Sequence, residues 1–235
     1  MHIAGHSHYP VNDPRSVWQG NYIAIGTGSV YYSEFTVDTA RAYHPADAGQ
    51  TANCWIVDLD ADSNMRLRGY DVNEEKQLCE VYLNNPADPK NRDYTPAKQK
   101  AASRAPIFAE NAAPAAETSF GGCTVTVPAA ISADGQPVVL YRAAARNRFG
   151  ATLAENWALP TYYRALTQAS VELSLSGLPE GEYTISVIAE NAYGKQSAPI
   201  QTTVSIPGER GFRRLIVRIR YLFDKIITFF KQIFG

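Results

Sequence analysis

Two histidines near the amino terminus have the spacing of a metal-binding loop. His6 and His8 flank one serine and follow Gly5 in the segment IAGHSH. Imidazole is the commonest protein ligand for borderline divalent metals, and two imidazoles on one short loop can reach two adjacent ions. A catalytic metal needs at least three protein ligands and an open position for water, so this pair predicts only part of a metal centre. The alternative is a solvated terminal loop.

The length and composition of the chain limit the classes of protein to which it can belong. The chain has 235 residues, of which 45% are hydrophobic, so it is long enough for one large or two modest domains, and two are predicted. A net charge of -1 argues against a nucleic-acid-binding protein. The first residues lack the basic start and apolar run of a signal peptide, and no stretch is long and apolar enough to cross a bilayer.

The three cysteines exclude two classes of small domain. Cys54, Cys79 and Cys123 are widely spaced and form no Cys-x-x-Cys pair, which argues against a zinc ribbon and against a disulfide-dense scaffold. Two interpretations remain open for Cys54 and Cys79. They form a bridge between neighbouring strands, or they are ordinary buried thiols.

Most of the chain has the alternating pattern of β-strands. Residues 21–37 suit two strands joined by a tight connection. Residues 52–60 and 65–72 flank a turn-forming sequence and predict a hairpin. Residues 85–104 are polar and rich in proline, which is typical of a linker or a connection along the surface. Alternation resumes beyond this segment, as in Val171, Leu173 and Leu175, which face one side of a predicted strand.

Residues 105–207 resemble a fibronectin type III domain. The most characteristic part is Leu178 to Pro199, in which Leu-Pro-x-Gly-x-Tyr places Tyr183 where β-sandwiches use a tyrosine corner. The resemblance implies a β-sandwich that acts as a spacer or adhesive module. It also implies that the intact parent is extracellular or associated with the cell surface.

Residues 1–84 resemble the C-terminal part of a calcineurin-like metallophosphoesterase. The motif is IAGHSH, followed by a loop and by IGTGS in a strand. That family has a two-sheet α/β sandwich with two metal ions, and the resemblance implies that His6 ligates one ion and His8 the other. The ions, which are iron, zinc or manganese, would activate a bridging water and stabilise charge on the phosphate oxygens of a phosphate-ester substrate.

The other motifs of that family are absent from this chain. We therefore expect a C-terminal fragment of a phosphoesterase (a hydrolase) that is inactive alone and does not complete the two-metal site by itself. Arg15 is the candidate for holding a substrate phosphate oxygen through its forked guanidinium. Trp18 is a candidate wall of the substrate pocket, and the alternative for both side chains is structural packing of the loop.

The last segment predicts a basic amphipathic helix at residues 211–234. Its apolar residues recur at three- and four-residue steps, and six basic residues stand against Asp224 alone. Such a helix binds a membrane surface or a groove of a partner, or it packs back on the β-sandwich. The candidate contact residues are Arg213, Arg214, Arg218, Arg220, Phe223 and Phe230.

The sequence thus predicts a mostly β chain: the C-terminal portion of an α/β metallophosphoesterase sandwich (1–84), a linker (85–104), a fibronectin type III-like β-sandwich (105–207) and an amphipathic helix (211–234). The first functional hypothesis is a part of a metal-dependent phosphoesterase. The alternative is a non-catalytic surface-attachment or adhesion module that uses the β-sandwich and the helix.

Overall fold

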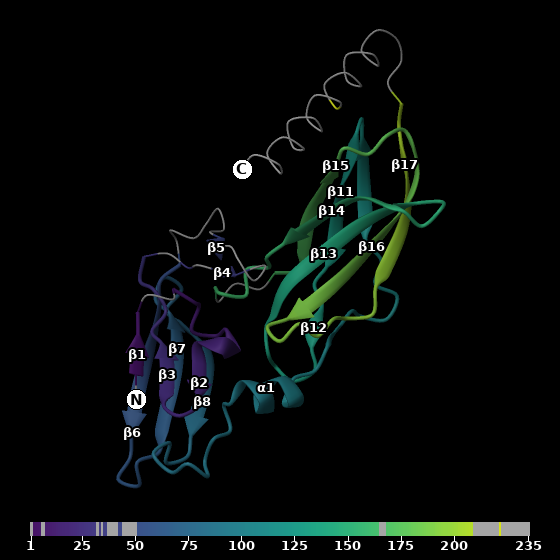
Figure 1. Cartoon of the computed structure of the whole chain (residues 1–235). Helices are drawn as coiled ribbons and strands as arrows, with labels where there is room; N and C mark the ends of the chain where they lie inside the picture. Colours follow the sequence, from purple (N-terminus) through teal and green to yellow (C-terminus); the bar gives the residue numbers. More distant parts are fainter. Residues whose placement is uncertain are drawn as a thin grey trace, which may run out of the picture.

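The computed structural model shows a mostly β chain made of two units joined by a short connection (Figure 1). The N-terminal unit comprises residues 2–83, and the β-sandwich comprises residues 106–206. The structure describes residues 2–5, 8–31, 33, 35–36, 42–43, 51–164, 168–208 and 221.

The N-terminal unit contains two three-stranded sheets. In the first, β3 (Ile23–Gly26) lies between β1 (His2–Ala4) and β2 (Val17–Gln19). In the second, β7 (Met65–Asp71) lies between β6 (Asn53–Leu59) and β8 (Lys76–Leu83). A separate pair is formed by β4 (Phe35–Thr36) and β5 (Ala42–Tyr43).

The two three-stranded sheets face each other across a small apolar core. Val17 and Ile25 of the first sheet pack against side chains of the second, namely Met65, Leu67 and Leu83. Alternation along β7 buries every second residue, which is the pattern of a strand with one face on a core. The unit is therefore a small two-layer β structure, without a helix longer than the single-turn η1 (Pro14–Ser16) among its described residues.

The predicted hairpin between residues 52–60 and 65–72 is confirmed as β6 and β7, which pair antiparallel. Its turn is closed by Asp60, whose carboxylate accepts hydrogen bonds from the backbone N–H groups of Asp62 and Asn64, both at 2.9 Å. Ser63 takes a positive φ of 65° in this turn. An aspartate that binds the following backbone is a usual way to build such a turn.

The prediction for residues 21–37 was only half right. Strands β3 and β4 lie within this segment, but they do not pair with each other, because β3 joins the sheet of β1 and β2 while β4 pairs with β5. Side-chain alternation reports which residues suit a strand and carries no information about the partner strand.

The connection between the units follows the surface of the N-terminal unit and then forms a helix. Gln19 holds it, since the backbone N–H of Tyr94 donates to its side-chain oxygen at 2.9 Å and its own backbone N–H donates to the carbonyl of Tyr94 at 3.0 Å. Helix α1 (Pro96–Ala102) follows, capped by Thr95, whose hydroxyl accepts from the N–H of Lys98. The segment predicted as a linker thus includes one short, N-capped helix.

The β-sandwich consists of a three-stranded and a four-stranded antiparallel sheet. The first contains β10 (Ala115–Ser119), β11 (Gly122–Pro128) and β15 (Ser170–Ser176), in that order. The second has the order β14 (Thr152–Ala158), β13 (Val138–Asn147), β16 (Gly181–Asn191) and β17 (Ile200–Ile206). A short pair, β9 (Pro106–Ile107) and β12 (Ile131–Ser132), adjoins them.

The core of the β-sandwich lies between its two sheets and is larger than that of the N-terminal unit. Val125, Ile185 and Val187 are completely buried in it. Tyr183 closes one end, because its hydroxyl donates to the carbonyl oxygen of Pro179 at 3.0 Å. The tyrosine corner predicted from the sequence is therefore formed, and it ties β16 to the turn that precedes it.

The three cysteines are free thiols. Cys54 lies on β6 and Cys79 on β8, and these strands lie on opposite sides of β7, so the two residues are not on neighbouring strands as a bridge would require. The predicted amphipathic helix, residues 211–234, lies outside the described residues except for Tyr221. Within the described part of the chain, no helix has the length and apolar character needed to cross a membrane.

Candidate functional site

The candidate site lies at the edge of the first sheet, where β1 and β3 end. These strands are parallel, with Ala4 opposite Gly26, so the loops that follow them leave the sheet at the same edge. Thr27 links the two loops, since its backbone N–H donates to the carbonyl oxygen of Ala4 at 3.0 Å. The segment with the predicted metal ligands therefore starts beside the Gly-Thr-Gly-Ser segment.

Gly28 shows why the second of these segments needs a glycine. Its φ of 71° lies in the left-handed region, and a Cβ at this position would come within 2.9 Å of Val11 and 3.0 Å of the backbone oxygen of Asn53. Val11 is 1% exposed. Val11, which belongs to the loop after the histidine motif, thus packs closely against Gly28, and it also lies against Gly69 of β7.

The structure describes one of the two predicted metal ligands. His8 is half-buried and takes a φ of 50°, which is uncommon for a residue other than glycine. His6 and His44 lie outside the described residues. His2 is exposed on β1 and has an edge contact with Tyr22, at 6.3 Å between ring centroids. The predicted ligand pair therefore stays a prediction.

Arg15, the candidate phosphate-binding residue, is paired with Asp13. Its Nε and one Nη donate to the two carboxylate oxygens at 2.8 and 2.6 Å, a bidentate arrangement. Asp13 is completely buried, and its carboxylate also accepts from the backbone N–H of Arg15 and caps the helix η1. Burial by itself lowers the pKa of Arg15, but the hydrogen bond and charge of Asp13 outweigh it and raise this pKa.

Asp13 has a further partner that sequence reasoning missed. The hydroxyl of Tyr162, in the loop between β14 and β15, donates to the second carboxylate oxygen of Asp13 at 3.1 Å. Burial and the charge of Asp13 raise the pKa of Tyr162 well above its ordinary value, so this hydroxyl stays protonated and serves as a donor. No local sequence pattern predicts a hydrogen bond between residues so far apart in the chain.

Trp18, the candidate wall of the substrate pocket, lies beside a turn. Its ring lies over Gly20, where a Cβ would come within 2.2 Å of it, and it has an edge contact with Tyr22 at 5.1 Å between centroids. Trp18 thus packs on the turn between β2 and β3, and it is not among the residues that line the neighbouring groove.

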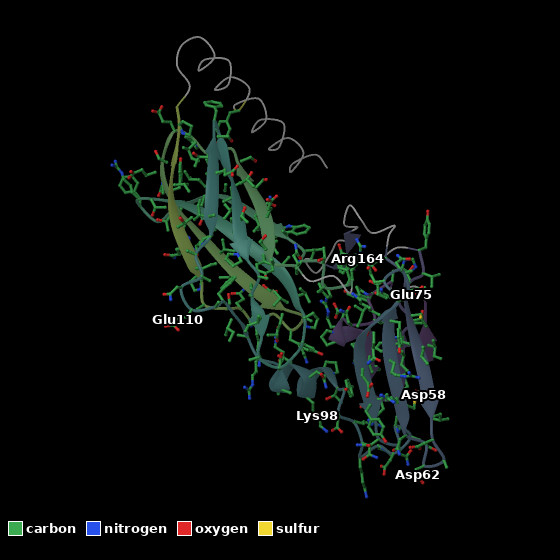
Figure 2. All side chains as sticks on the ribbon, turned by 180° about the vertical axis from the view of Figure 1, so that it is seen from behind. Asp58, Asp62, Glu75, Lys98, Glu110 and Arg164 are labelled. Carbon is green, nitrogen blue, oxygen red and sulfur yellow. The ribbon has the colours of Figure 1, made fainter. Side chains whose placement is uncertain are left out.

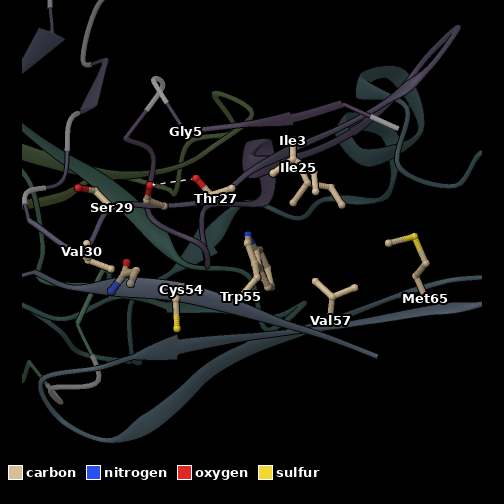
Figure 3. A pocket seen from close by; sticks show the side chains of 12 residues that line it. Ile3, Gly5, Ile25, Thr27, Ser29, Val30, Cys54, Trp55, Val57 and Met65 are labelled. Atoms are coloured by element: carbon tan, nitrogen blue, oxygen red, sulfur yellow. Dashed lines mark hydrogen bonds between the residues drawn. The ribbon is translucent and has the colours of Figure 1, made fainter. Parts of the chain in front are cut away.

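An apolar groove of about 600 Å³ opens beside the candidate site, between the two sheets. Figure 3 shows Ile3 and Ile25 of the first sheet on one side of it, with Trp55 and Val57 of β6 on the other. Three residues of these strands pair with buried residues of the neighbouring strand, so their side chains point to the core side. These residues, Ile3, Val57 and Leu59, are nevertheless 57%, 47% and 68% exposed. The two-layer structure is thus open along the edges of β1 and β6.

The described residues do not complete a metal centre. Among them, no group of three or more histidine, cysteine, aspartate or glutamate side chains is placed to bind one ion. His8 is the predicted ligand that the structure describes, and its imidazole suits zinc, iron or manganese. The structure thus places one of the two predicted imidazole ligands.

No protein-family model matches the chain, and no curated protein sequence matches it. Among solved structures, "Biofilm associated protein - BSP domain" is similar, with a TM-score of 0.28 and 13% sequence identity. The match covers 64% of this chain and 30% of that chain, so the chain spans less than a third of the length of that structure. A TM-score this low shows neither a shared fold nor a shared function.

Proposed function

We propose that the N-terminal unit is part of a calcineurin-like metallophosphoesterase domain and that it supplies His6 and His8 to a two-metal centre that hydrolyses phosphate esters. The observation that carries this proposal is the parallel pairing of β1 with β3. It brings Gly5, where the Gly-His-Ser-His segment starts, and the Gly-Thr-Gly-Ser segment to one sheet edge, where loops from several strands can share metal ions. Two such ions would stabilise the negative charge that develops on the phosphate oxygens.

The open side of the unit supports the same proposal. Ile3, Val57 and Leu59 face the core side but remain exposed, and within the described part of the chain β1 and β6 are the edge strands of their sheets. Exposed core-facing residues beside unpaired strand edges are costly in an isolated sandwich. We expect further elements of a phosphoesterase domain to cover this side and to bring the remaining metal ligands. Arg15 stays a candidate for phosphate binding, although Asp13 engages two of its nitrogen donors.

For residues 105–207, the fibronectin type III-like assignment is part of the same proposal. The division of strands into a sheet of three and a sheet of four, together with the Tyr183 corner, supports it. Domains of this kind serve as spacers or adhesive modules, and a parent that is extracellular or associated with the cell surface would follow.

The proposal is tested by histidine-dependent metal binding. The purified chain is titrated with Zn²⁺, and binding is followed by equilibrium dialysis and by the imidazole signals in NMR spectra. We expect the double variant His6→Ala/His8→Ala to lose most of the bound Zn²⁺, because two neighbouring imidazoles are the predicted ligands. We also expect fewer than two tightly held ions in the unmodified chain, because its sequence lacks the other metal-ligand motifs of that family.

The matched control removes the same number of imidazoles elsewhere. The double variant His2→Ala/His44→Ala takes away the other two histidines of the chain. Equal loss of Zn²⁺ in both double variants, or no loss in the first, would refute the assignment of the loop. Two tightly held ions per chain would show a complete site and refute the view that the site is shared.

A further inference from the structure

The two units meet at the loop that carries His8, and the contacts come from far along the chain. We define the histidine loop as residues 8–16. The side-chain amide of Asn12 donates to the carbonyl oxygen of Tyr162, and the hydroxyl of Tyr162 donates to Asp13. The hydroxyl of Tyr193, just after β16, donates to the carbonyl oxygen of Pro14 at 3.5 Å. Three consecutive residues of the loop are thus bound to the β-sandwich.

These hydrogen bonds lie within a wider contact between the units. The side-chain amide of Asn53 donates to the carbonyl oxygen of Tyr163 at 3.4 Å, and the Tyr163 ring packs on Phe35 at 4.9 Å between centroids. Arg164 forms an ion pair with Glu74 at 3.0 Å. Figure 2 shows Arg164 at the end of the N-terminal unit where Glu75 lies. A contact that combines buried aromatic rings with several hydrogen bonds fixes two domains more firmly than a flexible connection does.

A short chain of contacts leads from Tyr162 to the neighbour of His8. Tyr162 holds the carboxylate of Asp13, and Asp13 holds the guanidinium of Arg15. The guanidinium of Arg15 lies over the ring of Tyr9, at 5.0 Å from the ring centroid. Tyr9 directly follows His8, whose backbone is in the left-handed region. An unfavourable backbone conformation persists only where the surrounding contacts hold it.

We propose that the β-sandwich supports the histidine loop and that Tyr162 is a positioning residue for His8, through Asp13, Arg15 and Tyr9. The role as a positioning residue for a metal ligand rests on the function proposed above. The support of the loop by the β-sandwich rests on the contacts alone. The domain resembling a spacer is then a structural part of the site on the other unit.

The test compares Tyr162→Phe with Tyr141→Phe in the full chain. Both substitutions remove one buried hydroxyl, and Tyr141 accepts a hydrogen bond from the N–H of Ala130 at 2.7 Å inside the β-sandwich. Amide hydrogen exchange is measured at Asp13 and Ser16, whose N–H groups donate within the loop. We expect exchange at both amides to be roughly tenfold faster in Tyr162→Phe, the effect of losing one hydrogen bond to a charged group. We expect no such change in Tyr141→Phe.

A second readout concerns the metal. The apparent affinity of the chain for Zn²⁺ is expected to fall roughly tenfold in Tyr162→Phe and to stay within twofold in Tyr141→Phe, as is typical when a group that orients a ligand is lost. Unchanged exchange at Asp13 and Ser16 would overturn the support of the loop. Faster exchange with unchanged Zn²⁺ affinity would overturn the positioning of His8. If the unmodified chain binds no Zn²⁺ through its histidines, the proposed function fails, and the exchange data still decide whether the β-sandwich holds the loop.

Discussion

Replacing Asp13 by asparagine should destabilise the chain far more than the same substitution at a surface ion pair. The side chain of Asp13 is completely buried, and its two oxygens accept four hydrogen bonds, three from Arg15 and one from Tyr162. Asparagine keeps one acceptor oxygen but turns an amide NH₂ toward donors. The substitution therefore removes the charge and leaves at least one buried donor facing another donor.

The expected loss of stability depends on how exposed the hydrogen-bond partners of Asp13 are. Breaking a fully buried ion pair costs about 3–5 kcal/mol. The side chain of Arg15 is 33% exposed, so water replaces part of the lost interaction. The Tyr162 hydroxyl is buried, and leaving such a group unsatisfied costs about 1–3 kcal/mol. We expect the free energy of unfolding to fall by about 3 kcal/mol.

Urea denaturation measures this loss as a shift of the midpoint at constant slope. The control is Asp58→Asn, which removes the same charge from an exposed pair with Arg68, where the two side chains are 50% and 27% exposed. Exposed pairs contribute about 0–1 kcal/mol, so this variant should differ little from the unmodified chain. Equal midpoints for the two variants would show that the Asp13 carboxylate does not hold the loop, and the reasoning about the contact between the units would fail.

Three further predictions concern other parts of the chain. Tyr183→Phe removes the hydrogen bond to Pro179 and should lower the free energy of unfolding by about 1 kcal/mol in urea denaturation. An unchanged free energy would show that the tyrosine corner does not stabilise the β-sandwich. Burial raises the pKa of Cys79 from 9.0 to about 12, so between these pH values the unfolded chain gives up a proton that the folded chain keeps. Stability should therefore fall as the pH rises above 9, by up to about 1.4 kcal/mol per pH unit, and Cys79→Ala should show a smaller fall in the same denaturation series. Deleting residues 211–235 should abolish salt-sensitive sedimentation with anionic vesicles, and unchanged sedimentation would count against a membrane-binding role of that segment.

Local sequence patterns were enough to place several strands. Alternation in residues 65–72 and 171–175 marks positions that face a core, and both segments form strands with that alternation of burial. The turn at residues 61–64 and the corner at Tyr183 were predictable because each depends on side chains that bind the backbone within a few residues.

The contacts that build the candidate site were not predictable in this way. The parallel pairing of β1 with β3 and the hydrogen bond of Tyr162 to Asp13 join separate segments, and no sequence pattern in one segment indicates its partner. Arg15 illustrates the consequence. Its position beside the predicted metal-binding loop suggested a side chain that holds a substrate phosphate. In the structure its geometry is set by a buried carboxylate two residues away, which also binds a tyrosine of the other unit. The helix at residues 96–102 was not predicted, although Thr95 and Pro96 are a start signal, because the polar, proline-rich composition of the segment favours a linker.

The way the two units meet bears on what the β-sandwich does. A spacer needs only a covalent connection, and residues 84–105 supply it here. The structure adds hydrogen bonds between Tyr162 or Tyr193 and three consecutive residues of the histidine loop, and it buries the carboxylate that organises that loop. Burying a charge costs free energy and is tolerated where the partners are held in place. Since one of these partners belongs to the β-sandwich, the conformation of the histidine loop depends on both units, and a change that separates the units should alter the loop before it alters either core.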